Sequence, residues 1–344
     1  MKGYTRKSRE TVKMKDVARL ANVSPSTVSR VLSNSSLVAE ETRRRVLEAV
    51  EILKYRPNRL GRNLRKLTSK IVMVVFPDIT NPFFSRIIQA VEEVARERGY
   101  YVLLGDTRND IKLEREFVEL GKEKLVDGIL LATARIPKEE ILSLSLQLPI
   151  VLACEYIENY SIPTVSIDNT RAAYEATEYL IRLGHRCIAF INGPKGIILS
   201  RDRLKGYRKA CEDNNILIEE VLIEEGDFTV DSGYQIMRKF LLMQKRPTAV
   251  FAANDEMAVG AIKAIKEYGW QVPRDISVIG FDDIPLCRLV DPELTTISQP
   301  TYEIGKQAMT MLLDLIEGKS IINGQVILPH KLVERKSCME LATK

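Results

Sequence analysis

The sequence is poor in the residues on which most enzymes, metalloproteins and disulfide-rich domains depend. Its 344 residues include two histidines, one tryptophan and five cysteines that lie far apart. It has no C-x-x-C pair, metal-ligand cluster, G-x-S-x-G turn or Walker A loop, which argues against zinc sites, disulfide frameworks, serine hydrolases and P-loop enzymes. His185 falls in a turn before an apolar run, where a structural role is expected. We therefore predict a protein that is not an enzyme and holds no metal or cofactor.

Long apolar runs are also missing. No segment approaches the roughly 18 apolar residues that span a bilayer. The basic start "MKGYTRKSRETVK" is not followed by the apolar region of a secretory signal. Together with the scattered cysteines, these features predict a cytoplasmic protein with no membrane partner. Hydrophobic residues still make up 45% of the chain, which is enough for two or three compact units.

Charge is distributed unevenly along the chain. The first 70 residues hold 18 basic and 6 acidic side chains, whereas the remainder holds 33 basic and 40 acidic ones. A basic head on a mildly acidic body indicates that the head binds a polyanion. A solvated, lysine-rich tail is the alternative, and we assign such a basic flexible tail to residues 1–13.

Three helical segments follow this tail. The first, "KDVARLA", carries three apolar residues at helical spacing: Val17, Leu20 and Ala21. Ser24 before Pro25 is then typical of a helix start. The third segment, "AEETRRRVLEAVEILKY", carries four apolar residues on one face: Val46, Leu47, Val50 and Leu53. Two short helices, a tight turn and a closing helix predict a helix-turn-helix unit over residues 14–57.

The second helix, "PSTVSRVL", separates an apolar face from a polar one. Its apolar face consists of Val28, Val31 and Leu32. Its polar face consists of Ser26, Thr27, Ser29 and Arg30. Small hydroxyls allow close approach to a major groove, and an arginine can bind guanine O6 and N7. The polar face therefore predicts DNA binding, with a three-helix bundle that has no nucleic-acid role as the alternative.

A short basic segment, "NRLGRNLRK", connects this unit to the rest of the chain. It has the length of about two helical turns, which is marginal for an isolated helix, and Gly61 weakens it by about 1 kcal/mol relative to alanine. Leu64 between arginines suits a wedge in a minor groove, with Arg62 near the phosphates. A plain linker whose leucine packs on the body is the alternative. We assign residues 58–70 to a hinge helix and linker.

Residues 71 to about 330 alternate apolar runs of strand length with amphipathic runs of helical length. Eight or more such strands, from "IVMVVF" to "ISVIGF", predict two parallel, doubly wound α/β sheets. We place the first lobe at residues 71–162 with 293–324. The second lobe then spans residues 163–292 with 325–344, and the chain crosses between the lobes near Ile162, Asp291 and Asn323.

Ligands of open parallel sheets bind beyond the carboxyl ends of the strands. The residues that follow the predicted strands there are Phe83, Phe84, Asp168, Arg203, Phe228, Asn254 and Asp282. This set suits a small neutral polar ligand, because carboxylates and arginine bind hydroxyls and aromatic rings stack on flat surfaces. Each has a structural alternative. The carboxylates and the amide could cap helices, one phenylalanine could belong to the core, and the arginine could form an ion pair.

These segments carry a resemblance. "KDVARLANVSPSTVSRVL", "PNRLGRNLRK" and the body motifs "NPFF", "SIDN", "DRLKGY", "NDEMAVGA" and "VIGFDD" resemble the LacI/GalR family of bacterial repressors. The resemblance implies lobes of the periplasmic-binding-protein type and a dimer on a palindromic operator, with paired hinge helices wedged into the minor groove. It implies base reading at Pro25, Ser26 and Arg30, and effector contacts at the seven residues above. The DNA-binding set is then Ser24, Pro25, Ser26, Thr27, Ser29, Arg30, Asn34, Arg62 and Leu64. Gly61 stands where the family usually has alanine, which favours a looser hinge.

Within the family, "ENYSIPTVSIDN", "EEGDFTVDSG" and "DPELTTISQPTYEIGKQAM" are most similar to the cytidine repressor group. This similarity implies a nucleoside effector such as cytidine, with Phe228 stacked on the base and Arg203 near the ribose hydroxyls. "KGIILSRD" differs from that group, so ribose or another sugar is the alternative effector. A solute-binding or sugar-handling protein without a DNA role is the alternative from another class.

The expected assembly is a homodimer. No leucine heptads follow the last strand-like segment, which favours a dimer over a tetramer. A second transcription factor bound alongside is left open.

Overall fold

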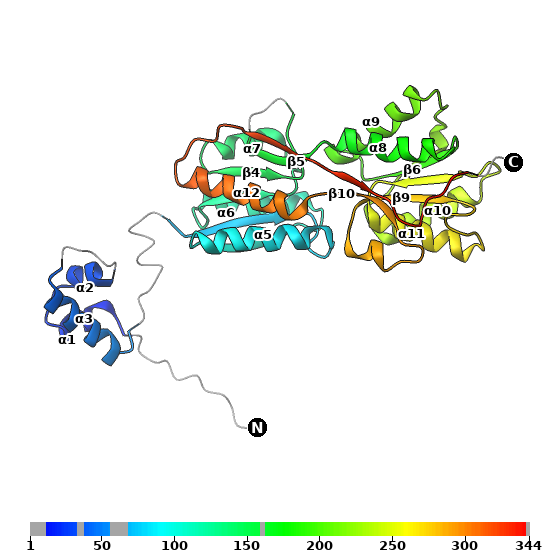
Figure 1. Ribbon diagram of the computed structural model, residues 1–344. Coiled ribbons are helices and arrows are strands. Elements are labelled where there is room, and N and C mark those ends of the chain that lie inside the picture. The colour runs from blue at the N-terminus through cyan, green and yellow to red at the C-terminus, as the bar shows by residue number, and fades with distance from the viewer. Residues whose placement is uncertain (1–11, 33–37, 56–67, 159–161, 342–344) are drawn as a thin grey trace, which may run out of the picture. The chain divides into compact units, whose positions relative to one another are not determined.

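The computed structural model describes residues 12–32, 38–55, 68–158 and 162–341, and Figure 1 shows the chain as a ribbon. The chain divides into two compact units, residues 1–69 and residues 70–344. Several sequence predictions lie outside the described residues. These are most of the basic tail, the hinge helix at 58–66, and the DNA contacts at Asn34, Arg62 and Leu64.

The first unit contains the three expected helices. They are α1 (Met14–Leu20), α2 (Pro25–Leu32) and α3 (Glu40–Ile52). Ser24 precedes α2 as predicted, and its hydroxyl accepts a hydrogen bond from the Thr27 backbone nitrogen at 3.2 Å. This cap satisfies one of the amide groups that a helix start leaves without a partner.

The core of this unit is built from small and β-branched side chains. Val17, Val28 and Val46 are fully buried, and Ala18 and Ala49 pack beside them. The prediction that Leu20 and Leu47 belong to this core is wrong, because they are 50% and 49% exposed. The buried faces of α1 and α3 include Ala18 and Ala49 instead. Small side chains at these positions let the short helices approach closely.

The second unit contains two six-stranded sheets. The first has the strand order β11-β5-β4-β3-β1-β2, and all of its strand pairs are parallel. Its strands are β1 (Ile71–Phe76), β2 (Tyr101–Asp106), β3 (Gly128–Leu131), β4 (Ile150–Ala153), β5 (Thr164–Ile167) and β11 (Gln325–Leu328). Helices α5 (Phe83–Glu97) and α12 (Thr301–Ile316) pack together on one face, and α6 (Ile111–Lys122) and α7 (Lys138–Ser145) cover the other.

The second sheet has the strand order β12-β10-β9-β8-β6-β7, in which β12 alone is antiparallel to its neighbour. Its strands are β6 (Ile188–Asn192), β7 (Ile223–Glu225), β8 (Ala249–Ala252), β9 (Ser277–Asp282), β10 (Thr295–Ser298) and β12 (Lys331–Val333). Its helices are α8 (Asn169–Arg182), α9 (Ile198–Asp213), α10 (Val230–Leu241) and α11 (Asp255–Glu267). In Figure 1, α8 and α9 lie on one side of this sheet and α10 and α11 on the other.

The chain crosses between the lobes at positions that differ from those predicted. Strands β5 and β11 belong to the first sheet, and β10 belongs to the second. The crossings therefore follow Ile167, Ser298 and Leu328, and the boundaries placed near residues 162, 291 and 323 are wrong. The physical reason is that each of these short strands completes the sheet it leaves, and the chain crosses only after the strand has ended. Figure 1 shows the connecting segments between the two lobes.

Candidate effector cavity and DNA-binding surface

The polar face of α2 forms a surface that DNA could approach. Pro25, Ser26 and Arg30 are exposed, and Thr27 and Ser29 are half-buried. The Ser24 hydroxyl lies 2.7 Å from the Ser26 hydroxyl. Because positions four apart on a helix lie on one face, Ser26 and Arg30 face the same direction. The predicted base-reading residues that the structure describes are therefore brought together.

Six of the seven predicted effector residues line one cavity between the lobes. Phe83 and Phe84 come from the start of α5, and the other four come from the second lobe: Arg203, Phe228, Asn254 and Asp282. The cavity holds about 100 Å³ and adjoins a hollow of about 550 Å³ that Glu155 and Ile197 also line. It lies at the strand ends, where ligands of open parallel sheets bind.

Asp168 is the exception, and its placement corrects the prediction. Its side chain is exposed and accepts a hydrogen bond from the Arg171 backbone nitrogen at 2.8 Å, which caps α8. It lines a different hollow, together with Gln325 and Ile327. The capping alternative therefore describes Asp168, whereas Asp282, the other carboxylate predicted for the effector site, does line the cavity.

Arg203 is a buried charged group of the cavity with several fixed contacts. It is 3% exposed and donates to Asn169 Oδ1 at 3.0 Å and to the Ala253 carbonyl oxygen. Its Nη2 lies 3.7 Å from Asp282 Oδ1, and its guanidinium carbon lies 3.8 Å above the Phe281 ring. These contacts hold the arginine in one orientation, so that its charge and that of Asp282 face the cavity as a fixed pair.

Asn254 positions a neighbour as well as lining the cavity. Its Oδ1 accepts from the Met257 backbone nitrogen at 3.0 Å and caps α11, while its Nδ2 donates to the Phe228 carbonyl oxygen at 2.8 Å. Phe228 has φ of 70°, and two other lining residues, Cys154 and Asp282, have φ of 69° and 119°. Such left-handed backbone is strained for non-glycine residues and is found at binding sites, where the surroundings hold it in place.

Burial changes the acidity of the cavity's carboxyl groups. It raises the pKa of Glu155 and of Glu256 to about 7. It also raises the pKa of Asp282, which the neighbouring Arg203 partly opposes, and that of the adjacent Asp255. The ionised forms are disfavoured because the site offers these groups less solvation than water does. At neutral pH, several of these groups can therefore carry a proton.

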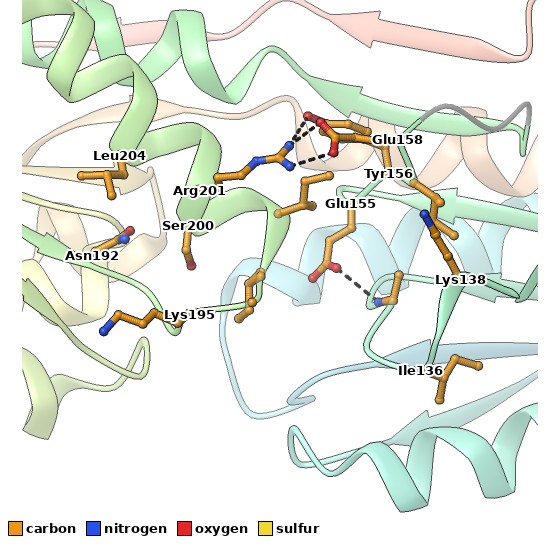
Figure 2. Close-up of a pocket in the computed structure, with 15 residues that line it drawn as sticks. Ile136, Lys138, Glu155, Tyr156, Glu158, Asn192, Lys195, Ser200, Arg201 and Leu204 are labelled. Atoms are coloured by element: carbon orange, nitrogen blue, oxygen red, sulfur yellow. Dashed lines mark hydrogen bonds and ion pairs between the residues drawn. The ribbon is translucent and has the colours of Figure 1, made fainter. Parts of the chain in front are cut away.

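Arg135 and Glu155 are among the charged residues of the cavity that sequence reasoning missed. Arg135 follows β3 and Glu155 follows β4, and the sequence predicts both strands. A position just after the end of a strand is the signal that identifies the other cavity residues, and it applies equally to these two. On the rim, the Arg201 guanidinium forms a bidentate pair with Glu158 at 2.8 and 2.9 Å, and the Tyr156 hydroxyl donates to Asp202 at 2.8 Å. Figure 2 shows Arg201, Glu158 and Tyr156 of this rim close together.

Other features singled out in the sequence have structural places. His185 is 2% exposed and lies 3.0 Å from both the Thr248 and Ser277 hydroxyls, and burial lowers its pKa. Within the described ranges, no group of His, Cys, Asp and Glu residues is arranged to hold a metal ion. No helix in the described part of the chain is long and apolar enough to cross a membrane.

A helix-turn-helix head and a two-lobed α/β body with a cavity between its lobes define a class of DNA-binding transcriptional regulators that bind small molecules. Residues 13–58 match the family model of bacterial regulatory proteins of the lacI family, and residues 177–338 match that of periplasmic binding protein-like domains. The chain belongs to the LacI family of DNA-binding repressors.

Two relatives are similar in sequence to this chain over nearly its whole length. The HTH-type transcriptional repressor CytR of Escherichia coli (strain K12) is 41% identical over 337 residues, which cover 98% of this chain and 99% of CytR. The ribose operon repressor of Halalkalibacterium halodurans is 36% identical over 94% of this chain and 96% of its own.

Solved structures give the same result. The Lac repressor dimer bound to operator and the anti-inducer ONPF has a TM-score of 0.85 at 30% identity, covering 96% of this chain and all of that one. A LacI family regulator from Enterococcus faecium with bound ribose has a TM-score of 0.71 at 30% identity, covering 79% of this chain and all of that one.

Proposed function

We propose that this repressor binds a palindromic operator as a homodimer in the cytoplasm, and that a nucleoside such as cytidine, bound between the lobes, controls it without being chemically changed. The observation that carries the proposal is the cavity. It combines aromatic rings on both lobes with a fixed arginine–carboxylate pair.

The aromatic groups support a ligand with a flat ring. Phe83 and Phe84 are packed edge to face with ring centroids 5.1 Å apart, and they line the cavity together with the second lobe's Phe228. Arg203 and Asp282 offer a donor and an acceptor of the kind that sugar hydroxyls need. The adjoining hollow of about 550 Å³ adds room that a free pentose does not require. Ribose is the second candidate, because a similar regulator has been solved with ribose bound.

The edge of the first sheet supports the dimer. Strand β2 is an edge strand, and its Leu103 and Leu104 are 46% and 41% exposed. An exposed apolar edge strand is prone to association unless a partner covers it. Two heads linked by such a contact would read the two halves of a palindrome, as symmetric dimers do.

The control mechanism follows from the lining. A ligand that contacts both lobes favours the closed arrangement, because only that arrangement offers both sets of contacts. The hinge segment leads directly from the head to the first lobe, so a change in lobe arrangement is felt in DNA affinity. By linkage, operator DNA must change effector affinity by the same factor as the effector changes DNA affinity.

Two measurements test the proposal. Gel shifts on the DNA upstream of the protein's own gene should detect binding, and Arg30→Ala should cost about 1–3 kcal/mol at one operator base pair and relax specificity there. An equal loss on all sequences would instead make Arg30 a phosphate contact. Titration calorimetry with cytidine and ribose, with and without operator DNA, tests control. Ribose binding without cytidine binding would overturn the effector choice, and an effector affinity unchanged by DNA would overturn the mechanism.

A further inference from the structure

Four polar side chains join the two lobes at the rim of the hollow. Tyr156 and Glu158 follow β4 in the first lobe, whereas Arg201 and Asp202 belong to α9 in the second. The Arg201 guanidinium donates to both Glu158 oxygens at 2.8 and 2.9 Å, and the Tyr156 hydroxyl donates to Asp202 Oδ2 at 2.8 Å. Figure 2 shows Arg201 reaching towards Glu158. We call these four residues the latch.

Arg201 joins the two contacts between the lobes into one network. Its Nη2 also lies 3.3 Å from the Tyr156 hydroxyl and 3.2 Å from Asp202 Oδ1. The side chains of Arg201 and Glu158 are 50% and 53% exposed, so water and salt weaken their attraction. The bidentate geometry nevertheless fixes the direction of the contact. The bonds that run between the lobes must therefore break together when the lobes separate.

The latch is connected to the cavity through neighbouring residues on both lobes. Glu155 precedes Tyr156, Arg203 follows Asp202, and both of these neighbours line the cavity. Arg203 is buried and fixed by its contacts within the second lobe. A shift of α9 relative to the first lobe therefore changes the latch and the cavity together.

We propose that the latch holds the lobes in the arrangement that assembles the cavity before an effector arrives. Its bonds form only while Glu158 and Arg201 are close, so they stabilise the assembled arrangement relative to one with separated lobes. An effector then binds a cavity that is already assembled, and less of its binding free energy is lost in bringing the lobes together. The effect on affinity, unlike the latch itself, rests on the proposed effector control.

A local structural role is the alternative. The latch would then only order the segment after β4, which also places Ile157 in the core of the first lobe. Such a role would leave the lobe arrangement unchanged when the latch is removed. The deciding quantity is therefore the distance between the lobes, measured at positions outside the latch.

Single-molecule fluorescence energy transfer on the full chain measures this distance without any ligand. Dyes can be attached through noncanonical amino acids at Leu146 in the first lobe and Leu242 in the second, because these side chains are 88% and 74% exposed. Glu158→Ala should shift the equilibrium towards separated lobes by about two- to fivefold, as expected for a half-exposed ion pair. Raising NaCl from about 0.05 to 0.5 M should shift the wild type in the same direction and the variant less, because salt screens the pair.

Further variants separate the latch from general effects of lost charge. Arg201→Ala should shift the equilibrium at least as far as Glu158→Ala, and the double variant should shift it no further than Arg201→Ala, because the pair is already lost. Tyr156→Phe should have a smaller effect, since it removes the hydroxyl and keeps the ring. Arg182→Ala is the matched control and should leave the equilibrium unchanged. Its side chain is 67% exposed and pairs with Glu178 at 2.6 Å within α8, so this pair does not join the lobes.

Calorimetry with cytidine tests the effect on affinity. The cytidine Kd of Glu158→Ala should rise by the same factor by which the assembled fraction falls in the fluorescence measurement. A Kd that stays at the wild-type value while the assembled fraction falls would overturn the link to affinity.

Three outcomes would overturn the latch itself. These are unchanged lobe distances in Glu158→Ala and Arg201→Ala, an equal shift in Arg182→Ala, and assembled lobes in every variant with no detectable separated population. Failure of cytidine to bind the wild type would refute the effector choice, whereas the fluorescence measurement would still decide whether the latch holds the lobes.

Discussion

Replacing Arg203 by methionine should destabilise the second lobe in a pH-dependent way. The substitution keeps a long buried side chain but removes the donors to Asn169 and Ala253 and the charge beside Asp282. Removing one partner of a buried ion pair typically costs about 3–5 kcal/mol. We expect that loss at pH 8, where Asp282 must either ionise without its partner or take up a proton at a cost.

The loss should be smaller at pH 5.5. Burial already places the pKa of Asp282 above its value in an unfolded chain, so wild-type stability falls as pH rises between those two values. Without Arg203 the folded pKa rises further, and the fall extends to higher pH. At pH 5.5 the protonated Asp282 needs no partner, and what remains is the cost of the unpaired Asn169 and Ala253 oxygens, about 1–3 kcal/mol.

Urea unfolding followed by tryptophan fluorescence measures this directly. Trp270 is the single tryptophan of the chain, and it packs under the Arg246 guanidinium in the second lobe, so its signal reports that lobe. The double variant Arg203→Met with Asp282→Asn should lose less than the sum of the single variants, and its loss should not change between the two pH values. Equal losses for Arg203→Met at both pH values, or strict additivity, would refute the reasoning.

Three further predictions concern single sites. Asp168→Ala should lower the free energy of unfolding by about 1 kcal/mol through loss of the α8 cap and leave effector affinity unchanged in calorimetry; weakened binding would return Asp168 to the effector site. Gly260→Ala should cost about 1–3 kcal/mol in urea unfolding, because its Cβ would lie 2.0 Å from the Val230 carbonyl oxygen. Gly324→Ala, with no atom within 4 Å of the added carbon, is the neutral control. Leu103→Lys should shift the protein from dimer to monomer in sedimentation velocity, and an unchanged dimer would exclude β2 from the interface.

Much of the architecture could be read from local patterns. Apolar runs of strand length between amphipathic stretches predict parallel sheets because the period of the side chains and the backbone geometry are set within a few residues. Ser24 before Pro25 predicts the start of α2 for the same reason, since a cap involves neighbours in sequence. The cavity residues could be found by inspecting strand ends, because all strands of a parallel sheet bring their carboxyl ends to one edge.

Two features depend on residues that are distant in sequence: the sheet to which a strand belongs, and the partner that a polar side chain contacts. Strand β11 pairs with β5, about 160 positions earlier, and nothing in "QVIL" states that choice, so the lobe boundaries were misplaced. Asp168 and Asp282 both follow apolar strands, yet one caps its own helix and the other meets Arg203. Arg135 and Glu155 came to line one cavity only because β3 and β4 lie side by side. Local periodicity is encoded within each segment, whereas the pairing of strands and the convergence of charges are decided by packing across the whole body.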